Sequence, residues 1–138
     1  DYYGKVFYLS QDVPIFQGTL KENIVFNQEI SDEQVIEAMY RFQLGELYER
    51  LPEGLNTIVS EKGMNFSGGE KQRIAFTRLA FTQAEILILD EATSALYEKT
   101  EEKVLQEVQE FTHNKLTILV THRPKTLRFV DEIIDLNE

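Results

Sequence analysis

The sequence contains no cysteine in its 138 residues. Disulfide frameworks, thiolate zinc sites and cysteine nucleophiles are therefore excluded. Basic residues are also scarce, with 14 lysines and arginines against 24 aspartates and glutamates, and the formal charge is -10. A protein that binds nucleic acid through its phosphates is expected to be basic, so these numbers argue against a nucleic-acid partner.

The chain has no long apolar run and very little proline. A membrane-spanning helix needs roughly 20 apolar residues in succession, and no segment approaches that length. The three prolines are isolated, and no linker rich in proline, glycine or serine divides the chain. A chain of 138 residues that is 42% hydrophobic fits one folded domain, so any contact with a membrane must come through a partner.

Three short segments have the pattern of strands: residues 5–10, 86–89 and 116–120. The last two are continuous apolar runs, which are typical of strands inside a parallel sheet that helices cover on both faces. A further strand is expected near residues 132–136. Helical spacing fills the intervals between strands, so the sequence predicts an α/β fold with a mostly parallel sheet flanked by helices.

Three helices are expected: over residues 32–43, from near Ser67 onward, and over residues 101–111. The second of these carries apolar residues toward the core. Three of its basic side chains are expected to stay solvated: Lys71, Arg73 and Arg78.

Polar residues follow three of the expected strands. Gln11 follows the first, Asp90 and Glu91 follow the second, and His122 follows the third. Ligands of open parallel sheets bind beyond the carboxyl ends of the strands. Each residue alone is explained at least as well as a strand cap. The four together indicate a site that handles a metal, a water and a proton.

The residues at this edge suit phosphate chemistry. An apolar strand that ends in Asp90 can hold Mg²⁺, because the strand fixes the carboxylate beside a dry core. Glu91 points another way and is suited to orient or deprotonate a water that attacks a γ-phosphate. At Ser67, Gly68 and Gly69, glycines leave backbone N–H groups open to an anion at a helix start. Taken alone, this last segment fits an ordinary serine cap slightly better.

Read together, these segments resemble the nucleotide-binding domain of an ABC transporter. Residues 66–73 (FSGGEKQR) resemble the family signature, and residues 86–96 (ILILDEATSAL) resemble the Walker B strand and D-loop. Gln11 matches the Q-loop and His122 matches the switch histidine. The order and spacing agree with the family over nearly the whole chain.

The resemblance implies a role for each of these residues toward ATP and Mg²⁺. Asp90 would hold Mg²⁺, Glu91 would be the catalytic base, Gln11 would touch the metal and the attacking water, and His122 would contact the γ-phosphate. In this family the signature closes over ATP held by a second nucleotide-binding domain in a head-to-tail dimer. Four signature residues would make that contact: Ser67, Gly68, Gly69 and Glu70.

A P-loop is not found in the sequence. The motif needs glycine, four residues, Gly-Lys and then Ser or Thr, whereas Gly4-Lys5 is followed by Val6. The expectation is an incomplete domain, the C-terminal portion from the Q-loop onward, which alone binds ATP weakly and does not hydrolyse it. The strand near residues 132–136 would then lack its usual neighbour, and self-association or a rearranged C-terminus is expected.

The resemblance also divides the chain. Residues 12–83 would form mainly the helical signature subdomain, inserted between two parts of a P-loop NTPase-like (RecA-like) core, residues 1–11 and 84–138. Residues 15–24 and 61–63 resemble segments of exporter-type members that face the coupling helices of membrane domains. Three apolar side chains fit such a contact or plain core packing equally well: Ile15, Phe16 and Tyr40.

The implied function is ATP-driven export of a substrate by an ATPase that works with membrane-spanning domains at the cytoplasmic face of the cell membrane. Two alternatives remain at this stage: a non-hydrolysing fragment or regulatory module that acts by binding, and a soluble ABC ATPase without a transport role. Two residues depart from the family pattern. Tyr97 stands where the D-loop normally has aspartate, and Glu70 replaces the more frequent glutamine of the signature.

Overall fold

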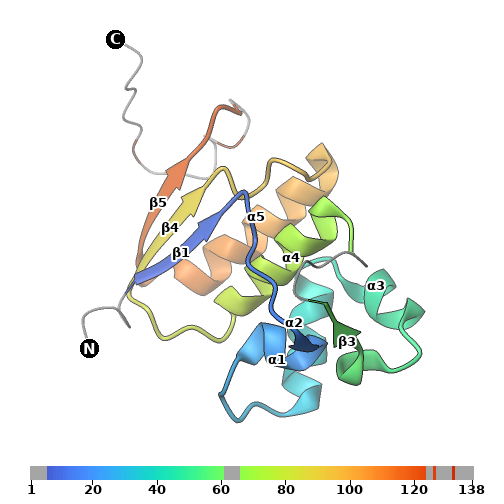
Figure 1. Cartoon of the computed structure of the whole chain (residues 1–138). Helices are drawn as coiled ribbons and strands as arrows, with labels where there is room; N and C mark the ends of the chain where they lie inside the picture. Colours follow the sequence, from blue (N-terminus) through green and yellow to red (C-terminus); the bar gives the residue numbers. More distant parts are fainter. Residues whose placement is uncertain (1–5, 61–65, 124–125, 127–131, 133–138) are drawn as a thin grey trace.

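The computed structural model describes residues 6–60, 66–123, 126 and 132 (Figure 1). The segment 61–63 and, apart from Glu132, the strand expected near residues 132–136 lie outside the described residues. Within the described part of the chain, no helix has the length and apolar character needed to cross a membrane.

The main sheet consists of three parallel strands at the positions that the sequence predicts. They are β1 (Val6–Ser10), β4 (Ile86–Asp90) and β5 (Leu116–Val120), in the order β1-β4-β5. Ser10 pairs with Asp90, and Asp90 pairs with Val120, so all three strands end at the same level. Residues that follow the strands therefore start from one edge of the sheet.

Two long helices, α4 (Gly68–Leu79) and α5 (Glu98–Thr112), lie behind the sheet in Figure 1. Helix α4 begins where the sequence predicts, with Ser67 as its N-cap, whereas α5 begins three residues earlier than expected. Their apolar side chains pack with the strands in one core that includes Leu9, Leu87, Leu89, Ala75, Phe76, Leu79, Val104, Leu105 and Val108. This core fixes where β4 ends and where α4 begins.

A second, mostly helical core forms from the chain between β1 and α4. It contains β2 (Gly18–Thr19), α1 (Leu20–Val25), α2 (Asp32–Arg41), α3 (Gly45–Arg50), the 3₁₀ helix η2 (Gly54–Asn56) and β3 (Ile58–Val59). The expected helix over residues 32–43 ends at Arg41, because Gln43 adopts a left-handed backbone conformation with φ of 66°. The sequence did not predict the short α1, whose start is fixed by a capping box between Thr19 and Glu22.

The two cores meet at α2 and α4. Phe42, at the end of α2, stacks on Phe76 of α4 and on Phe111 of α5, with ring centroids 6.4 and 5.6 Å apart. Arg41 forms two hydrogen bonds with the Glu107 carboxylate, at 2.8 and 3.1 Å. The helical part is thus packed directly against the helices that support the sheet.

The expectation that Arg73 and Arg78 remain solvated is wrong. Arg78 is 7% exposed, and Arg73 is half-buried. Both guanidinium groups donate to backbone carbonyls of the helical part: Arg73 to Gln43 O at 2.5 Å, and Arg78 to Asn23 O at 2.7 Å and Pro14 O at 2.8 Å. Arginine was expected outside because it is charged, but its five donors can satisfy carbonyls that a packed loop would otherwise leave without partners.

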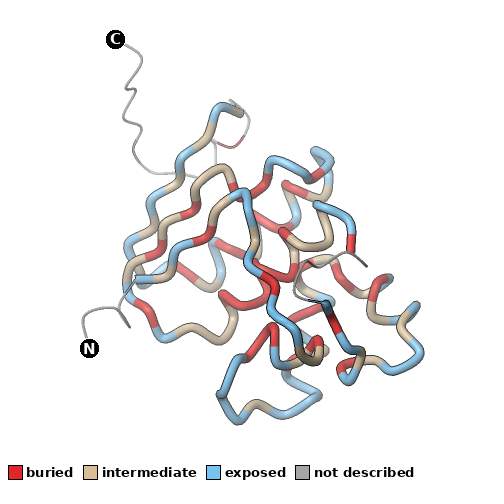
Figure 2. Tube along the Cα trace, in the orientation of Figure 1, coloured by how far each residue is buried: buried red, intermediate tan, exposed pale blue. Residues whose placement is uncertain are grey.

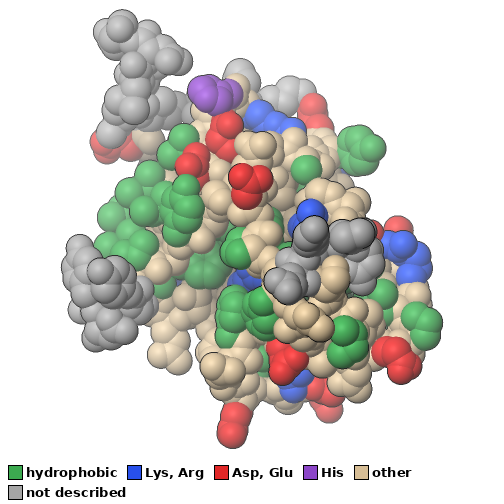
Figure 3. Space-filling view, viewed as in Figure 1, with side chains coloured by type: hydrophobic (Ala, Val, Ile, Leu, Met, Phe, Trp, Pro, Cys, Tyr) green, Lys and Arg blue, Asp and Glu red, His purple; other side chains and the backbone are tan. Residues whose placement is uncertain are grey.

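The expectation that helices cover both faces of the sheet is not met in the described residues. Alternate side chains of β5 are exposed, with Leu116 at 59% (Figure 2). Figure 3 shows hydrophobic side chains gathered over the strands on this face. An apolar run in the sequence predicts that a strand can be covered on both faces, but it does not identify what covers each face.

One buried hydroxyl in the sheet has no hydrogen-bond partner. Thr117 Oγ1 is the only such side-chain atom in the described part of the chain. Thr117→Val removes the hydroxyl and keeps the side chain's shape, so we expect the free energy of unfolding to rise by about 1 kcal/mol. Urea denaturation of the 138-residue chain measures this change.

Thr77→Val is the matched control for this prediction. Thr77 is also buried, but its hydroxyl donates to Arg73 O at 2.7 Å. We expect its replacement to lower the free energy of unfolding. A Thr117→Val variant that is destabilised as much as Thr77→Val would contradict the assignment of an unsatisfied hydroxyl.

Candidate functional site

The structure brings the ends of all three parallel strands to one edge. Gln11 follows Ser10 directly, and Glu91 follows Asp90 directly. The Glu91 backbone N–H donates to Val120 O at 2.9 Å, which holds the end of β4 against the end of β5. His122 comes two residues after Val120. The four strand-end residues that the sequence singles out therefore belong to, or follow, strands that end at the same edge of the sheet.

Glu91 and His122 face each other across this edge. Glu91 Oε1 lies 3.7 Å from His122 Nε2, and the imidazole is 81% exposed. Glu91 has a φ of 53°, a left-handed conformation that is uncommon for a residue other than glycine. Its N–H is held by Val120 O, and its carbonyl accepts a hydrogen bond from Ser94 N at 3.3 Å. Backbone strain of this kind is often found at functional sites.

Asp90 has a partner that the sequence did not reveal. The Tyr8 hydroxyl donates to Asp90 Oδ2 at 2.8 Å from the neighbouring strand. This hydrogen bond raises the pKa of Tyr8 above its usual value, aided by partial burial and by the negative charge of Asp90. Tyr8 therefore stays protonated and orients the Asp90 carboxylate at the strand end.

The donor groups at the edge fit Mg²⁺ bound together with phosphate. No cluster of three or more histidine, aspartate or glutamate side chains able to hold a metal occurs among residues 6–60, 66–123, 126 and 132. Mg²⁺ commonly takes only one or two protein carboxylates and completes its shell with water and substrate phosphates. Asp90 can supply such a carboxylate, and Gln11 can supply an amide oxygen beside it.

The start of α4 is organised by a capping box. Ser67 Oγ accepts from Glu70 N at 3.1 Å, and Ser67 N donates to Glu70 Oε1 at 2.9 Å. Glu70 Oε2 accepts from Arg50 at 2.6 Å. Burial alone would raise the pKa of Glu70, but the Ser67 N–H and the Arg50 guanidinium together hold it below its usual value. Glu70 is thus a charged residue that fixes the helix start, where first-turn N–H groups have no acceptor within the helix.

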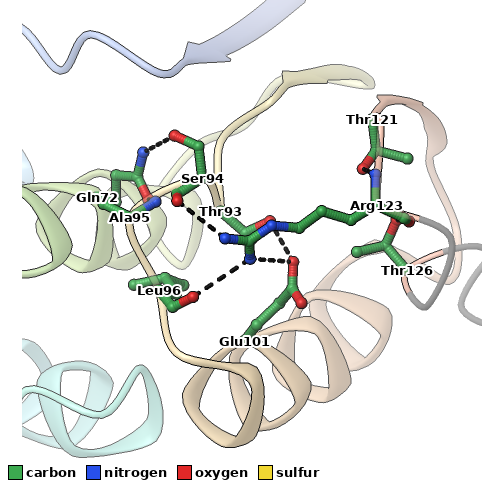
Figure 4. Close-up of polar contacts among 9 residues, drawn as sticks. All are labelled: Gln72, Thr93, Ser94, Ala95, Leu96, Glu101, Thr121, Arg123 and Thr126. Atoms are coloured by element: carbon green, nitrogen blue, oxygen red, sulfur yellow. Dashed lines mark hydrogen bonds and ion pairs between the residues drawn. The ribbon is translucent and has the colours of Figure 1, made fainter.

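Close packing explains why glycine stands at positions 68 and 69, which the sequence did not indicate. They lie against Ala95, in the loop between β4 and α5, and a Cβ atom at Gly69 would lie 3.1 Å from Ala95 O. One turn further along α4, Gln72 donates to Ser94 Oγ and accepts from Ala95 N, both at 2.9 Å (Figure 4). The loop at residues 92–97 connects the start of α4 to the end of β4 through these contacts.

Sequence reasoning missed three polar residues around this site: Tyr8, Gln72 and Arg123. Tyr8 lies in a predicted strand and Arg123 follows the singled-out His122, but nothing in their spacing indicates their partners. Their contacts depend on strand register and on the path of a loop, which the sequence pattern does not specify.

Comparison with known proteins identifies the family of this chain. A family described as ABC transporter matches residues 1–94, which is more than half of the chain. The chain belongs to the ABC transporter family.

The similar proteins are exporters and ATP-binding proteins. The chain is 39% identical over 132 residues to the ABC transporter ATP-binding protein YwjA of Bacillus subtilis, covering 95% of this chain and 23% of that protein. It is 42% identical over 130 residues to the mitochondrial iron-sulfur clusters transporter ATM1 of Saccharomyces cerevisiae, covering 92% of this chain and 19% of that protein. The chain therefore spans about a fifth of the length of these relatives.

A solved structure shows the same fold. A bacterial Atm1-family ABC exporter with ATP bound matches with a TM-score of 0.82 and 33% identity, over 91% of this chain and 22% of that chain. The predictions of an exporter-type ABC domain and of an α/β fold with a parallel sheet flanked by helices are confirmed. At the level of the family, these matches support ATP binding and ATP-driven export.

Proposed function

We propose that this chain is the C-terminal portion, from the Q-loop onward, of a nucleotide-binding domain that couples ATP hydrolysis to export across a membrane. The observation that carries the proposal is the common level at which β1, β4 and β5 end. This register gathers an amide, two carboxylates and an imidazole at one edge. Such a set can position a triphosphate, its metal and an attacking water.

Each residue at this edge has a proposed role. Asp90, oriented by Tyr8, and Gln11 would hold Mg²⁺, which neutralises charge on the phosphates when bound. Glu91 would accept a proton from the attacking water, and His122 would contact the γ-phosphate. The 3.7 Å separation of Glu91 and His122 supports this division, since both side chains reach the same small volume.

The signature residues would act on a second nucleotide. We propose a head-to-tail dimer in which Ser67, Gly68 and Gly69 contact ATP held by the opposite domain, while Glu70 fixes the helix end that presents them. Apart from the Glu70 N–H, which Ser67 Oγ caps, the first-turn N–H groups of α4 have no acceptor within the helix, and this supports binding of an anion there. Tyr97 is 87% exposed at the start of α5 and makes no side-chain cap, so it is free to contact the opposite domain in place of the usual aspartate.

Membrane-spanning domains are the second proposed partner, at the cytoplasmic face of the cell membrane. Phe16 and Phe26 stack with ring centroids 5.6 Å apart, and both are more than a third exposed. Ile15, by contrast, is buried in the helical core. An exposed aromatic pair of this kind is suited to receive a short helix of a membrane domain.

The test compares ATP hydrolysis by the complete nucleotide-binding domain with hydrolysis by the 138-residue chain alone. The chain contains no Gly-x₄-Gly-Lys-Ser/Thr sequence, whose backbone N–H groups and lysine bind the phosphates. We expect phosphate release from the complete domain, with specific activity that rises with protein concentration as dimers form. We expect release from the chain alone to be lower by about 100-fold or more.

Two outcomes would contradict the proposal. Turnover by the chain alone that depends on Glu91 would show that the P-loop is not required. A complete domain that binds ATP with no turnover at any concentration would favour the alternative of a module that acts by binding.

A further inference from the structure

Arg123 reaches from the loop after β5 to the loop Ala92–Tyr97. It directly follows His122, and its guanidinium donates to Ser94 O at 2.9 Å and to Leu96 O at 3.3 Å (Figure 4). The same group donates to Glu101 Oε2 at 3.0 Å. One side chain therefore joins the segment that carries His122 to the loop that follows Glu91.

Glu101 is an anchor for Arg123 inside the fold. Its side chain is only 7% exposed, and Oε2 also accepts from Thr93 Oγ1 at 2.5 Å. A buried carboxylate needs a cationic or hydrogen-bonding partner, and Arg123 is the partner with opposite charge within the described chain. The pairing holds Arg123 in one place.

The same loop is held on its other side by α4. Gln72 is buried and makes hydrogen bonds to both Ser94 and Ala95. Ser94 is thus held by two hydrogen bonds: its hydroxyl accepts from Gln72, and its carbonyl accepts from Arg123. The loop lies between the helix that carries the signature residues and the segment that carries His122.

We propose that Arg123 is a positioning residue that holds His122 in register with the loop Ala92–Tyr97 and, through Ser94 and Gln72, with the start of α4. The inference rests on the proposed function, because it concerns how His122 is placed for ATP hydrolysis. It adds a residue to which sequence analysis gave no role.

The geometry requires arginine. The three acceptors of Arg123, at Ser94, Leu96 and Glu101, lie in different directions, and a planar guanidinium reaches them together. A lysine ammonium at this position can pair with Glu101 but cannot also hold both carbonyls. Arg123→Lys therefore keeps the positive charge beside Glu101 but removes hydrogen bonds that position the loop.

The first experiment measures the kinetics of the Arg123→Lys variant of the complete nucleotide-binding domain. We expect kcat to fall by about 10-fold, since small displacements of a catalytic group are costly, while KM for ATP changes by less than about twofold. The melting temperature should stay within about 2 °C of the wild type, because the charge pair is kept. A merely structural role would lower stability without this selective loss of kcat.

The second experiment uses the 138-residue chain and needs no ATP. The Ala95 N–H, which donates to Gln72, should exchange with solvent about 10-fold faster in Arg123→Lys, while the N–H groups of β4 exchange at the wild-type rate. Faster exchange confined to the loop supports the positioning role even if the complete domain proves not to hydrolyse ATP, in which case the proposed function alone fails.

Arg41→Lys is the matched control. Arg41 also makes two hydrogen bonds with a carboxylate of α5, but it lies at the contact between the two cores, away from the sheet edge. Its variant should keep wild-type kcat and wild-type exchange at Ala95. Two results for Arg123→Lys would overturn the proposal. One is wild-type exchange at the Ala95 N–H, and the other is wild-type kcat in a domain whose hydrolysis depends on Glu91. A kcat loss equal to that of Arg41→Lys would also overturn it.

Discussion

Replacing Glu91 with glutamine is expected to lower kcat for ATP hydrolysis by the complete domain by at least about 100-fold, because the amide cannot accept the proton of the attacking water. Glutamine keeps the size of the side chain, so affinity for ATP should remain within about twofold. The left-handed backbone at Glu91 is held by hydrogen bonds of its own N–H and carbonyl, which the substitution leaves in place. Steady-state phosphate release and equilibrium binding of ATP measure the two quantities.

Glu85→Gln is the matched control for Glu91→Gln. Glu85 is an exposed glutamate directly before β4, at the opposite end of the strand from Glu91. The same chemical change there should leave kcat within about twofold of the wild type. If the two variants hydrolyse ATP at equal rates, Glu91 is not the catalytic base.

Replacing Arg78 with methionine is expected to lower the free energy of unfolding of the 138-residue chain by about 3 kcal/mol. Methionine keeps the apolar stem of the side chain but removes the donors to Asn23 O and Pro14 O. It also removes the cation that lies 5.2 Å from the centre of the Phe26 ring. Urea denaturation followed by circular dichroism measures the change.

The magnitudes of the opposing effects decide the sign of this prediction. Burial lowers the pKa of Arg78 to about 10. This shift corresponds to a free-energy cost of roughly 3 kcal/mol for burying the charged guanidinium. Two hydrogen bonds from a charged donor contribute about 1.5–3 kcal/mol each, which offsets the burial cost. Truncation then takes the donor from the buried Asn23 carbonyl, at about 1–3 kcal/mol, and from the Pro14 carbonyl, whose bond is only partly buried, and the loss at Asn23 dominates.

The lowered pKa also sets a pH dependence. Because the folded-state pKa of Arg78 lies below its unfolded value, the unfolded chain binds more protons above about pH 10. The contribution of Arg78 to stability therefore rises with pH in that alkaline range and is constant near neutrality.

Arg50→Met is the control that separates buried from exposed arginine. Arg50 pairs with Glu70, but its side chain is 65% exposed, and exposed ion pairs contribute less than about 1 kcal/mol. If Arg78→Met costs no more than Arg50→Met, the buried guanidinium contributes no net stability, and apolar packing replaces it fully.

The elements that support the site were predictable because their signals are local. Each main strand is an apolar run that stops at a polar residue, and Ser67 carries a capping sequence at the start of α4. Once the strands are taken as parallel, Gln11, Asp90 and His122 must gather at one edge. Short-range sequence pattern and one rule of sheet topology are sufficient to place these residues together.

The contacts that refine the site were not predictable because they join distant segments. Tyr8 and Asp90 are 82 residues apart in sequence, and Arg78 and Pro14 are 64 apart. A buried arginine and a solvated one look alike in sequence, since the difference lies in whether a loop presents its carbonyls to the guanidinium. The same holds for Gln72 and Arg123, whose partners belong to a loop without periodic pattern.

The sheet face that no helix of the described residues covers carries apolar and polar side chains on neighbouring strands. Leu116, Ile118 and Val120 of β5 are exposed on it, whereas on the neighbouring strands the Tyr8 hydroxyl, from the level of Ile118, reaches Asp90 at the level of Val120. A segment that packs onto this face must therefore be amphipathic, apolar where it lies over β5 and rich in hydrogen-bond donors or positive charge where it passes Asp90 on β4. An entirely apolar segment would bury the Asp90 carboxylate without a hydrogen-bond partner. An entirely polar segment would leave the aliphatic side chains exposed to water.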